Sequence, residues 1–329
     1  MTPFVSPPPP PLRCIYPTYD FTHCIVDAIE DIDYSICTLE FEVRRESYYW
    51  LLESLEMYRP KVYEMSRLDI THTFMSKRKI KALVMEGTLR GWDDPRLSTL
   101  AGLRRRGYTA EAIKMFCREI GVTRNQTTIQ MSRLEGCLRR TFEEGAARAM
   151  AVLDPLKVVL TNYVSESKDG DTDWVEVPNH PQYIEMGTHR VARASTVYIE
   201  RSDFRAEDDS DYFGLAPGKS AYLRFFGPAV TCTGFEADAD GTVTEVRCEI
   251  DYPRAIKPKG VIHWAAEGPT GEVRIYEHLF TAEEVSEDWR NELNPNSEKV
   301  YPNAMIDASL AEAAKTKPAG TPFQFERQG

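Results

Sequence analysis

The basic segment Met75–Lys79, which reads Met-Ser-Lys-Arg-Lys, holds the residues whose types and spacing best suit chemistry. It lies between a predicted strand over residues 62–68 and a predicted helix that Gly87 would end. Lysines beside small residues on such a loop suit a triphosphate, because a mobile ammonium group can follow the charge that grows on a leaving pyrophosphate. A solvated basic surface is the alternative, and it is the commoner origin of a short basic run.

The secondary structure predicted around this loop changes along the chain from mixed helices and strands to helices and then to strands. Helical periodicity follows the candidate N-cap Thr22 and returns over residues 47–55, with a predicted strand over residues 35–41 between them. Residues 98–148 have a helical pattern. From Met150 onward, short β-like runs are separated by Pro, Gly, Asn and Asp, which predicts an all-β barrel or sandwich with room for two such units.

The composition is that of a globular protein whose thiols stay reduced. The 329 residues suffice for two or three domains, and no apolar run approaches the ~20 residues of a membrane span. Residues 1–13 are proline-rich and lack the pattern of a secretory signal. The seven cysteines are odd in number and form no C-x-x-C, so neither a disulfide framework nor a metal site is predicted, and a cytoplasmic location is expected.

Charge is distributed unevenly, although the net value of -11 by itself argues against a nucleic-acid partner. Between Pro60 and Arg148 there are 18 Lys and Arg against 10 Asp and Glu, a local charge of +8. The rest of the chain, with 22 basic and 41 acidic side chains, has a local charge of -19. Phosphate binding depends on the local surface, so this segment is a candidate nucleic-acid face, with a solvated helical domain as the alternative.

Seven short motifs follow one another along the chain. They are Tyr16–Cys24, Cys37–Phe41, Ser66–Leu68, Met75–Lys79, Gly91–Arg96, Leu103–Gly107 and, near the end, Phe323–Arg327. In this order they resemble the class I glutaminyl-tRNA synthetases, and the resemblance runs from about Cys14 to the last residue. Each motif is short, but the ordered series is specific.

The resemblance implies a multidomain α/β plus α plus β architecture. Residues 14–95 would be the second half of a Rossmann-type class I catalytic domain, and residues 96–147 a helical domain that contacts the tRNA stem. Residues 148–329 would form two antiparallel β-barrels that bind the anticodon, incomplete at the C-terminal end, and residues 1–13 lie outside the family pattern. None of the six histidines forms the family's His-x-Gly-His signature, so an incomplete form of the enzyme is expected.

By resemblance, an ATP site lies in the α/β part. Lys77 would be the catalytic residue, which stabilises the transition state of adenylate formation, and Mg²⁺ would accompany the ATP. The residues assigned to ATP are Thr38, Arg67, Leu68, Met75, Ser76 and Lys77. A structural ion pair is the alternative role for Arg67.

The resemblance places Tyr19, His23 and Cys37 around the glutamine side chain, with His23 acting through a water molecule. A glutamate pocket must neutralise a carboxylate, for which arginine is best suited. The glutamyl-tRNA synthetases have arginine at the position of Cys37, whereas a neutral thiol leaves the pocket suited to an amide. Packing at a helix start is the alternative role for Tyr19 and His23.

The resemblance also assigns contacts with tRNA. The residues are Arg104, Arg105, Arg148, Arg224, Gln324 and Arg327. The first two, with Arg106, would face the inner corner of the tRNA, although a solvated helix face is the alternative. The others would contact unstacked anticodon bases, whose edges arginine and glutamine can bind. Bacterial members have arginine where this chain has Gly214 and Tyr222, so the third anticodon base is expected to be read differently.

The implied function is that of a glutamine–tRNA ligase, which activates glutamine with ATP and transfers it to tRNA(Gln) in cytoplasmic translation. Two other functions stay open. One is a non-catalytic tRNA-binding module of the same family, and the other is a glutamyl-tRNA synthetase, against which Cys37 argues. The expected partners are tRNA(Gln), glutamine, ATP and, in a complex, other synthetases; no membrane is expected.

Overall fold

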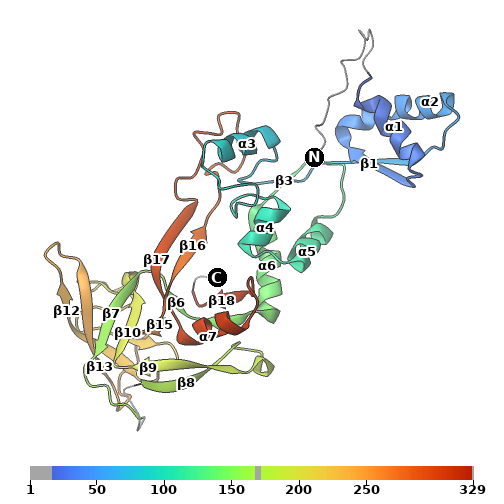
Figure 1. Cartoon of the computed structure of the whole chain (residues 1–329). Coiled ribbons are helices and arrows are strands. Elements are labelled where there is room, and N and C mark those ends of the chain that lie inside the picture. Colours follow the sequence, from blue (N-terminus) through green and yellow to red (C-terminus); the bar gives the residue numbers. More distant parts are fainter. Residues whose placement is uncertain (1–16, 167–171, 328–329) are drawn as a thin grey trace, which may run out of the picture.

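The structure, a computed structural model, describes residues 17–166 and 172–327 of an elongated molecule (Figure 1). The proline-rich residues 1–13, together with Cys14 and Tyr16, lie outside the described residues. An α/β body, a group of helices and a β-rich part follow one another along the chain and along the length of the molecule (Figure 1). Within the two described ranges, no helix combines the length and apolar character needed to cross a membrane.

The α/β body is a β–α–β unit with two parallel strands. Its elements are α1 (Tyr19–Ile29), β1 (Tyr34–Thr38), the 3-10 helix η1 (Leu39–Arg44), α2 (Arg45–Ser54) and β2 (Lys61–Met65). Buried Cys24, Tyr48 and Leu52 form the core between the two helices and one face of the sheet. On the other face Ile36 and Tyr63 are register partners and stay more than half exposed, although both faces of a parallel sheet are ordinarily covered.

Two predicted boundaries in this body are wrong. α1 begins at Tyr19, so Thr22 lies inside the helix, where its hydroxyl donates to the Tyr19 carbonyl at 2.9 Å. Such a local bond competes with capping and is common for threonine within helices. The predicted strand over residues 35–41 ends at Thr38, because the chain turns into η1. The predicted helix over residues 47–55 is confirmed by α2.

The basic segment Met75–Lys79 does open a helix, α3 (Lys77–Met85), which follows the short strand β3 (Asp69–Ile70). Gly87 lies just beyond the helix with φ +77, a backbone conformation that favours glycine and confirms the predicted end. The apolar face of α3 packs against Phe280 and Trp289, which belong to the C-terminal half of the chain. A segment far away in sequence therefore holds this helix.

Three helices follow: α4 (Leu100–Arg106), α5 (Ala110–Ile120) and α6 (Met131–Gly145). They share a core that includes Leu103, Phe116 and Leu134. The helical pattern predicted over residues 98–148 is confirmed for these helices, with Gly121 just after α5 and α6 beginning at Met131, but residues 147–148 belong to a strand instead. Between α5 and α6, β4 (Thr128–Ile129) pairs in parallel with β3, the short strand that precedes α3.

The β-rich part contains most of the strands of the chain. They are β5 (Ala147–Ala149), β6 (Ala151–Val152), β7 (Pro155–Leu160), β8 (Thr172–Pro178), β9 (Thr188–Ala194), β10 (Thr196–Glu200), β11 (Ser220–Leu223), β12 (Ala229–Ala237), β13 (Val243–Ile250), β14 (Val261–Ile262), β15 (Trp264–Ala266), β16 (Thr270–Tyr276), β17 (Glu298–Ile306) and β18 (Phe323–Phe325). The helical pieces here are η2 (Ile184–Met186), η3 (Arg201–Asp203) and α7 (Ala308–Thr316). Seven strands form one sheet in the order β14-β11-β12-β13-β7-β10-β15. Because β14 and β15 are separated only by His263, this sheet nearly closes on itself.

The expectation of wholly antiparallel strands is wrong for three pairs in the β-rich part. β7 pairs with β13, β11 with β14, and β5 with β18 in parallel. The remaining strands form a three-stranded sheet, β16-β17-β6, and the antiparallel hairpin β8–β9. A periodic pattern of apolar residues predicts that a strand exists but not its partner, and a strand returning from far along the chain can enter in either direction.

Gly214 stands where the backbone leaves no room for a side chain. A Cβ atom on it would lie 2.5 Å from the carbonyl oxygen of Asp203, which explains why arginine is not accommodated there. We expect Gly214→Ala to lower the free energy of unfolding by about 1–3 kcal/mol, measured by urea denaturation. Gly136→Ala on α6 is the matched control, since a Cβ there meets nothing within 4 Å and alanine favours a helix. Equal destabilisation by both variants would contradict this account.

Candidate functional site

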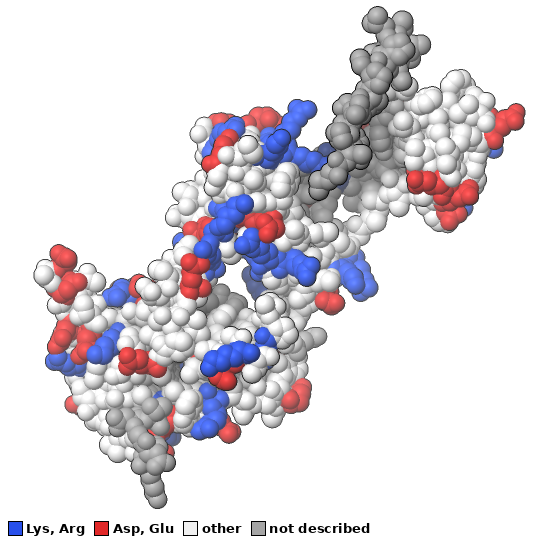
Figure 2. Space-filling model, viewed as in Figure 1, with Lys and Arg blue, Asp and Glu red and all other residues white. Residues whose placement is uncertain are grey.

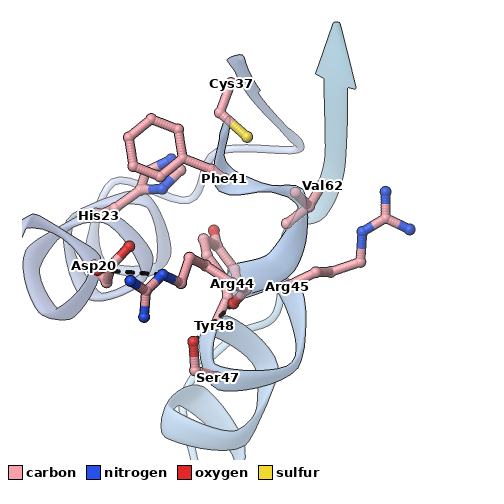
Figure 3. Close-up of a pocket in the computed structure, with 9 residues that line it drawn as sticks. All are labelled: Asp20, His23, Cys37, Phe41, Arg44, Arg45, Ser47, Tyr48 and Val62. Carbon is pink, nitrogen blue, oxygen red and sulfur yellow. Dashed lines mark hydrogen bonds and ion pairs between the residues drawn. The ribbon is translucent and has the colours of Figure 1, made fainter. Parts of the chain in front are cut away.

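A small pocket opens where α1, η1 and α2 meet the carboxyl end of β1 (Figure 3). It is lined by Asp20, His23, Cys37, Phe41, Arg44, Arg45, Ser47, Tyr48 and Val62. Ligands of parallel α/β sheets bind beyond the carboxyl ends of the strands, and Cys37 is the next-to-last residue of β1. The structure therefore brings together His23 and Cys37, two of the three residues predicted to contact glutamine.

Tyr19, the third of these residues, lies one helical turn before His23 at the rim of the pocket. The two rings are stacked with their centroids 5.3 Å apart. Phe41 lies against both, with its ring centroid 5.3 Å from that of Tyr19 and 6.2 Å from that of His23. Since Tyr19 is 59% exposed, packing alone does not explain its position at the first turn of α1.

Asp27 is a member of this site that the sequence analysis missed. Its Oδ2 lies 3.3 Å from His23 Nε2 and accepts hydrogen bonds from the hydroxyls of Ser35 and Tyr48 at 2.5 Å and 3.3 Å. Ser35 Oγ is also 3.2 Å from His23 Nε2. Asp27 and Ser35 thus orient the imidazole from behind. The spacing of Asp27 four residues after His23 on a predicted helix was the available signal.

Both arginines that line the pocket have carboxylate partners. Arg45 donates from Nε to Oε1 of the buried Glu64 at 2.9 Å, and Figure 3 shows its side chain pointing away from His23. Arg44 Nε lies 4.0 Å from Asp20 Oδ2. Burial, followed by the charge of Glu64, raises the pKa of the Cys37 thiol, which therefore stays neutral. Each arginine of the lining thus has a carboxylate beside it, and Cys37 adds no charge.

The predicted ATP residues Thr38, Arg67 and Leu68 lie beside the pocket at the ends of the two parallel strands. Thr38 ends β1 and is the register partner of Met65, which ends β2. Arg67 Nη2 is 2.6 Å from Glu40 Oε1 in an exposed ion pair. Such a pair contributes little stability, so the guanidinium can exchange Glu40 for a phosphate.

Met75, Ser76 and Lys77, the other ATP candidates, lie at the amino end of α3. Figure 1 shows α3 apart from β1. Lys77 is exposed at a helix N-terminus, where anions are stabilised. Lys79 points elsewhere, since its Nζ is 3.5 Å from both the carbonyl of Ser286 and the carboxylate of Glu287. The structure thus divides the ATP candidates into two groups.

The predicted stem contacts Arg104 and Arg105 are exposed on α4. Arg105 Nη1 lies 3.0 Å from Asp93 Oδ2. Arg106 has a structural role, because it donates to the carbonyl of Tyr276 at the end of β16 at 2.8 Å. Figure 2 shows lysine and arginine side chains along the middle of the molecule, with acidic side chains among them and at both ends.

The four predicted anticodon contacts gather around β18. Gln324 is the register partner of Arg148 in the parallel pair β5–β18. Arg224 Nε lies 3.3 Å from Glu326 Oε2, and Arg327 donates to Asp203 Oδ2 at 2.5 Å. Among the described residues, Arg148 Nε and Gln324 Oε1 are buried atoms that make no hydrogen bond. Six other buried side-chain atoms of the described residues share this property, and Arg224 Nε is one of them.

Arg148 shares a pocket with Asn179 and His189, two residues that the sequence analysis missed. The pocket lies between β5, the β8–β9 hairpin and α7. His189 Nδ1 is 2.8 Å from Asn179 Oδ1. Burial lowers the pKa of His189, against an opposite effect of Asp307, so its ring is neutral near pH 7 and offers both a donor and an acceptor. Asparagine beside proline, as at Asn179, indicates a turn and gives no sign of a binding role.

Comparison with known families gives three matches along the chain. The family described as "tRNA synthetases class I (E and Q), catalytic domain" matches residues 12–144. Two families described as "tRNA synthetases class I (E and Q), anti-codon binding domain" match residues 146–251 and 261–329. The first match thus spans the α/β body and the three helices, and the others span the β-rich part.

Individual relatives agree with these matches. The chain is 49% identical over 322 residues to a probable glutamine–tRNA ligase of Dictyostelium discoideum and 47% identical over 327 residues to a cytoplasmic glutamine–tRNA ligase of Arabidopsis thaliana. It is 44% identical over 328 residues to a glutamine–tRNA ligase of Tolumonas auensis. Each match covers 96% of this chain but only 40%, 40% and 58% of the respective relative.

Proposed function

Because this chain belongs to the class I (E and Q) tRNA synthetases, we propose that it forms part of a glutamine–tRNA ligase. The reaction is the ATP-dependent activation of glutamine, followed by its transfer to the terminal ribose of tRNA(Gln). The observation that carries the choice of glutamine is the pocket around Cys37, whose arginines are paired with Asp20 and Glu64. A glutamate side chain would bring a further negative charge without an uncommitted cation in that lining.

The chemistry is assigned to three groups of residues. His23, oriented by Asp27, and Cys37 receive the glutamine amide, with Tyr19 at the rim. Thr38, Arg67 and Leu68 at the strand ends accept ATP, with Mg²⁺ bound to its phosphates. Lys77 and its neighbours Met75 and Ser76 supply positive charge and helix N–H groups to the phosphates when α3 and the strand ends approach.

Residues 14–95 are the catalytic part, and the rest of the chain serves tRNA recognition. Residues 96–147 contact the tRNA stem through Arg104 and Arg105, and residues 148–329 bind the anticodon. Arg148 and Gln324 bind one base edge with support from Asn179 and His189, while Arg224 and Arg327 border the next position. A cytoplasmic location, as in the name of the Arabidopsis relative, and association with other synthetases complete the proposal.

The alternative function is a tRNA-binding module without catalysis. It is favoured by one observation, the separation of α3 from β1 (Figure 1). This alternative keeps the helices and the β-rich part in their recognition roles and differs only in the chemical step.

Pyrophosphate exchange tests the proposal on the 329-residue chain. We expect glutamine-dependent exchange of ATP with pyrophosphate in the presence of tRNA(Gln), no exchange with glutamate, and at least a tenfold loss for Lys77→Ala. Arg78→Ala, which changes the next exposed cation, is the matched control and should retain most of the rate. Exchange with glutamate would refute the assigned amino acid. Tight tRNA binding without any exchange would show that these 329 residues recognise tRNA but do not carry out the chemical step.

A further inference from the structure

Two cysteines face each other where a hairpin leaves the core of the seven-stranded sheet. Cys232 on β12 and Cys248 on β13 are register partners, and they are 1% and 0% exposed. Both are free thiols, and their strands are joined by a short turn after Ala237. The register of the sheet therefore places the two thiols opposite each other on neighbouring strands.

Backbone hydrogen bonds identify the geometry of this pair. The N–H of Cys232 donates to the carbonyl of Lys219 at 3.0 Å, and its carbonyl accepts from Gly218 N–H at 2.8 Å, so both groups point toward β11. The carbonyl of Cys248 accepts from Thr161 N–H at 2.9 Å, beyond the end of β7. The two cysteines are therefore a non-hydrogen-bonded pair, whose Cα atoms lie about 4.5 Å apart with close side chains. That separation lies within the range of about 4.4–6.8 Å that a disulfide spans.

The two thiols also differ in acidity and protection. A hydrogen bond from the Cys248 thiol lowers the pKa of Cys232 and raises the pKa of Cys248 itself. Cys232 is the last buried residue of β12, and the strand register shifts between it and Gly234. Local opening is easiest at such a bulge beside exposed strand, so the Cys232 sulfur lies close to the route by which an oxidant would enter.

We propose that Cys232 and Cys248 are a redox modification site that a peroxide converts into a cross-strand disulfide. The Cys232 thiolate attacks one oxygen of hydrogen peroxide, the O–O bond breaks, and hydroxide leaves and is protonated to water, which gives a sulfenic acid. The Cys248 sulfur then attacks the Cys232 sulfur, the S–O bond breaks, and a second water leaves with the thiol proton. Two thiols lose two electrons and the peroxide gains them. A dithiol reductant reverses the bond by exchange.

The test oxidises the folded 329-residue chain with hydrogen peroxide, unfolds it in denaturant, alkylates the remaining thiols with N-ethylmaleimide and maps the peptides by mass spectrometry. We expect a loss of two alkylation sites, a linked pair of peptides that carry Cys232 and Cys248, and full reversal by dithiothreitol. Cys117→Ala, which removes an exposed thiol, should still form the link, whereas Cys232→Ala should leave Cys248 open to alkylation.

The wild-type peptide map decides the matter even if Cys232→Ala fails to fold. A map in which Cys232 and Cys248 both remain alkylated while other cysteines are oxidised would overturn the proposal. So would sulfinic acids at the two positions without a linked peptide, because these would show that the second sulfur cannot reach the first.

Discussion

Replacing Asp94 with asparagine is expected to lower the free energy of unfolding by about 3 kcal/mol. Asp94 is 0% exposed and accepts hydrogen bonds from the Arg90 N–H at 3.0 Å and from Arg96 Nε and Nη2 at 2.9 Å each. Asparagine keeps the shape but removes the charge, so the Arg96 guanidinium, only 8% exposed, would be left buried without its counter-ion. Urea denaturation measures the loss.

The neighbouring carboxylate provides the matched control for this prediction. Asp93 forms an exposed pair with Arg105, so Asp93→Asn should change the free energy of unfolding by less than about 1 kcal/mol. The Asp94 turn also seats α4, because a Cβ on Gly102 would lie 2.6 Å from the Asp94 carbonyl oxygen. Comparable decreases in the free energy of unfolding for Asp94→Asn and Asp93→Asn would show that the Asp94–Arg96 pair does not stabilise this turn.

The contribution of Asp94 should depend on pH in a defined direction. Burial alone would raise its pKa, but the hydrogen bonds from Arg96 and from two backbone N–H groups outweigh burial and lower the pKa to about 2. A depressed folded-state pKa stabilises the protein above the unfolded pKa of 3.8 and loses this effect as pH falls toward 2. The difference in the free energy of unfolding between wild type and Asp94→Asn should therefore be constant near neutral pH and shrink between pH 4 and 2. A difference that persists unchanged through this window would contradict the assignment.

Arg148→Ala and Gln324→Ala are each expected to weaken binding of tRNA(Gln) by about 10- to 100-fold. Both side chains carry buried polar atoms that make no hydrogen bond, so a base edge would satisfy them. Because the two residues are register partners, their effects should be less than additive in the double variant. Fluorescence anisotropy with labelled tRNA measures the affinities of all three variants.

Two controls distinguish recognition of a base from attraction to the phosphates of the tRNA. Arg247→Ala removes a half-exposed arginine from β13, distant in sequence from β18, and should change affinity little. Variants at Arg148 or Gln324 should lose discrimination against a tRNA with a substituted anticodon base, whereas loss of a phosphate contact weakens all tRNAs equally. Equal weakening for matched and substituted tRNAs would place these residues on the backbone of the tRNA.

Local sequence patterns predicted the elements whose spacing of apolar residues repeats within a few residues. The helix after Met75–Lys79 and its end at Gly87 followed from apolar spacing and a stop signal, and α2 followed from spacing alone. The sequence pattern did not predict β12 and β17. Gly234 interrupts β12, Pro302 interrupts β17, and much of each strand is polar and exposed. A strand without clear alternation leaves little trace in the sequence.

The sequence by itself determined that a thiol, Cys37, stands at this position, the order of the motifs and the change from helical to β-like pattern near Met150. Only the tertiary structure decided which residues meet: Gln324 beside Arg148, Asp27 behind His23, and Phe280 against α3. The physical reason is that periodicity reports burial of a residue on its own element. Partners are chosen by packing and hydrogen bonding between elements far apart in the chain, and a one-dimensional pattern does not record that choice.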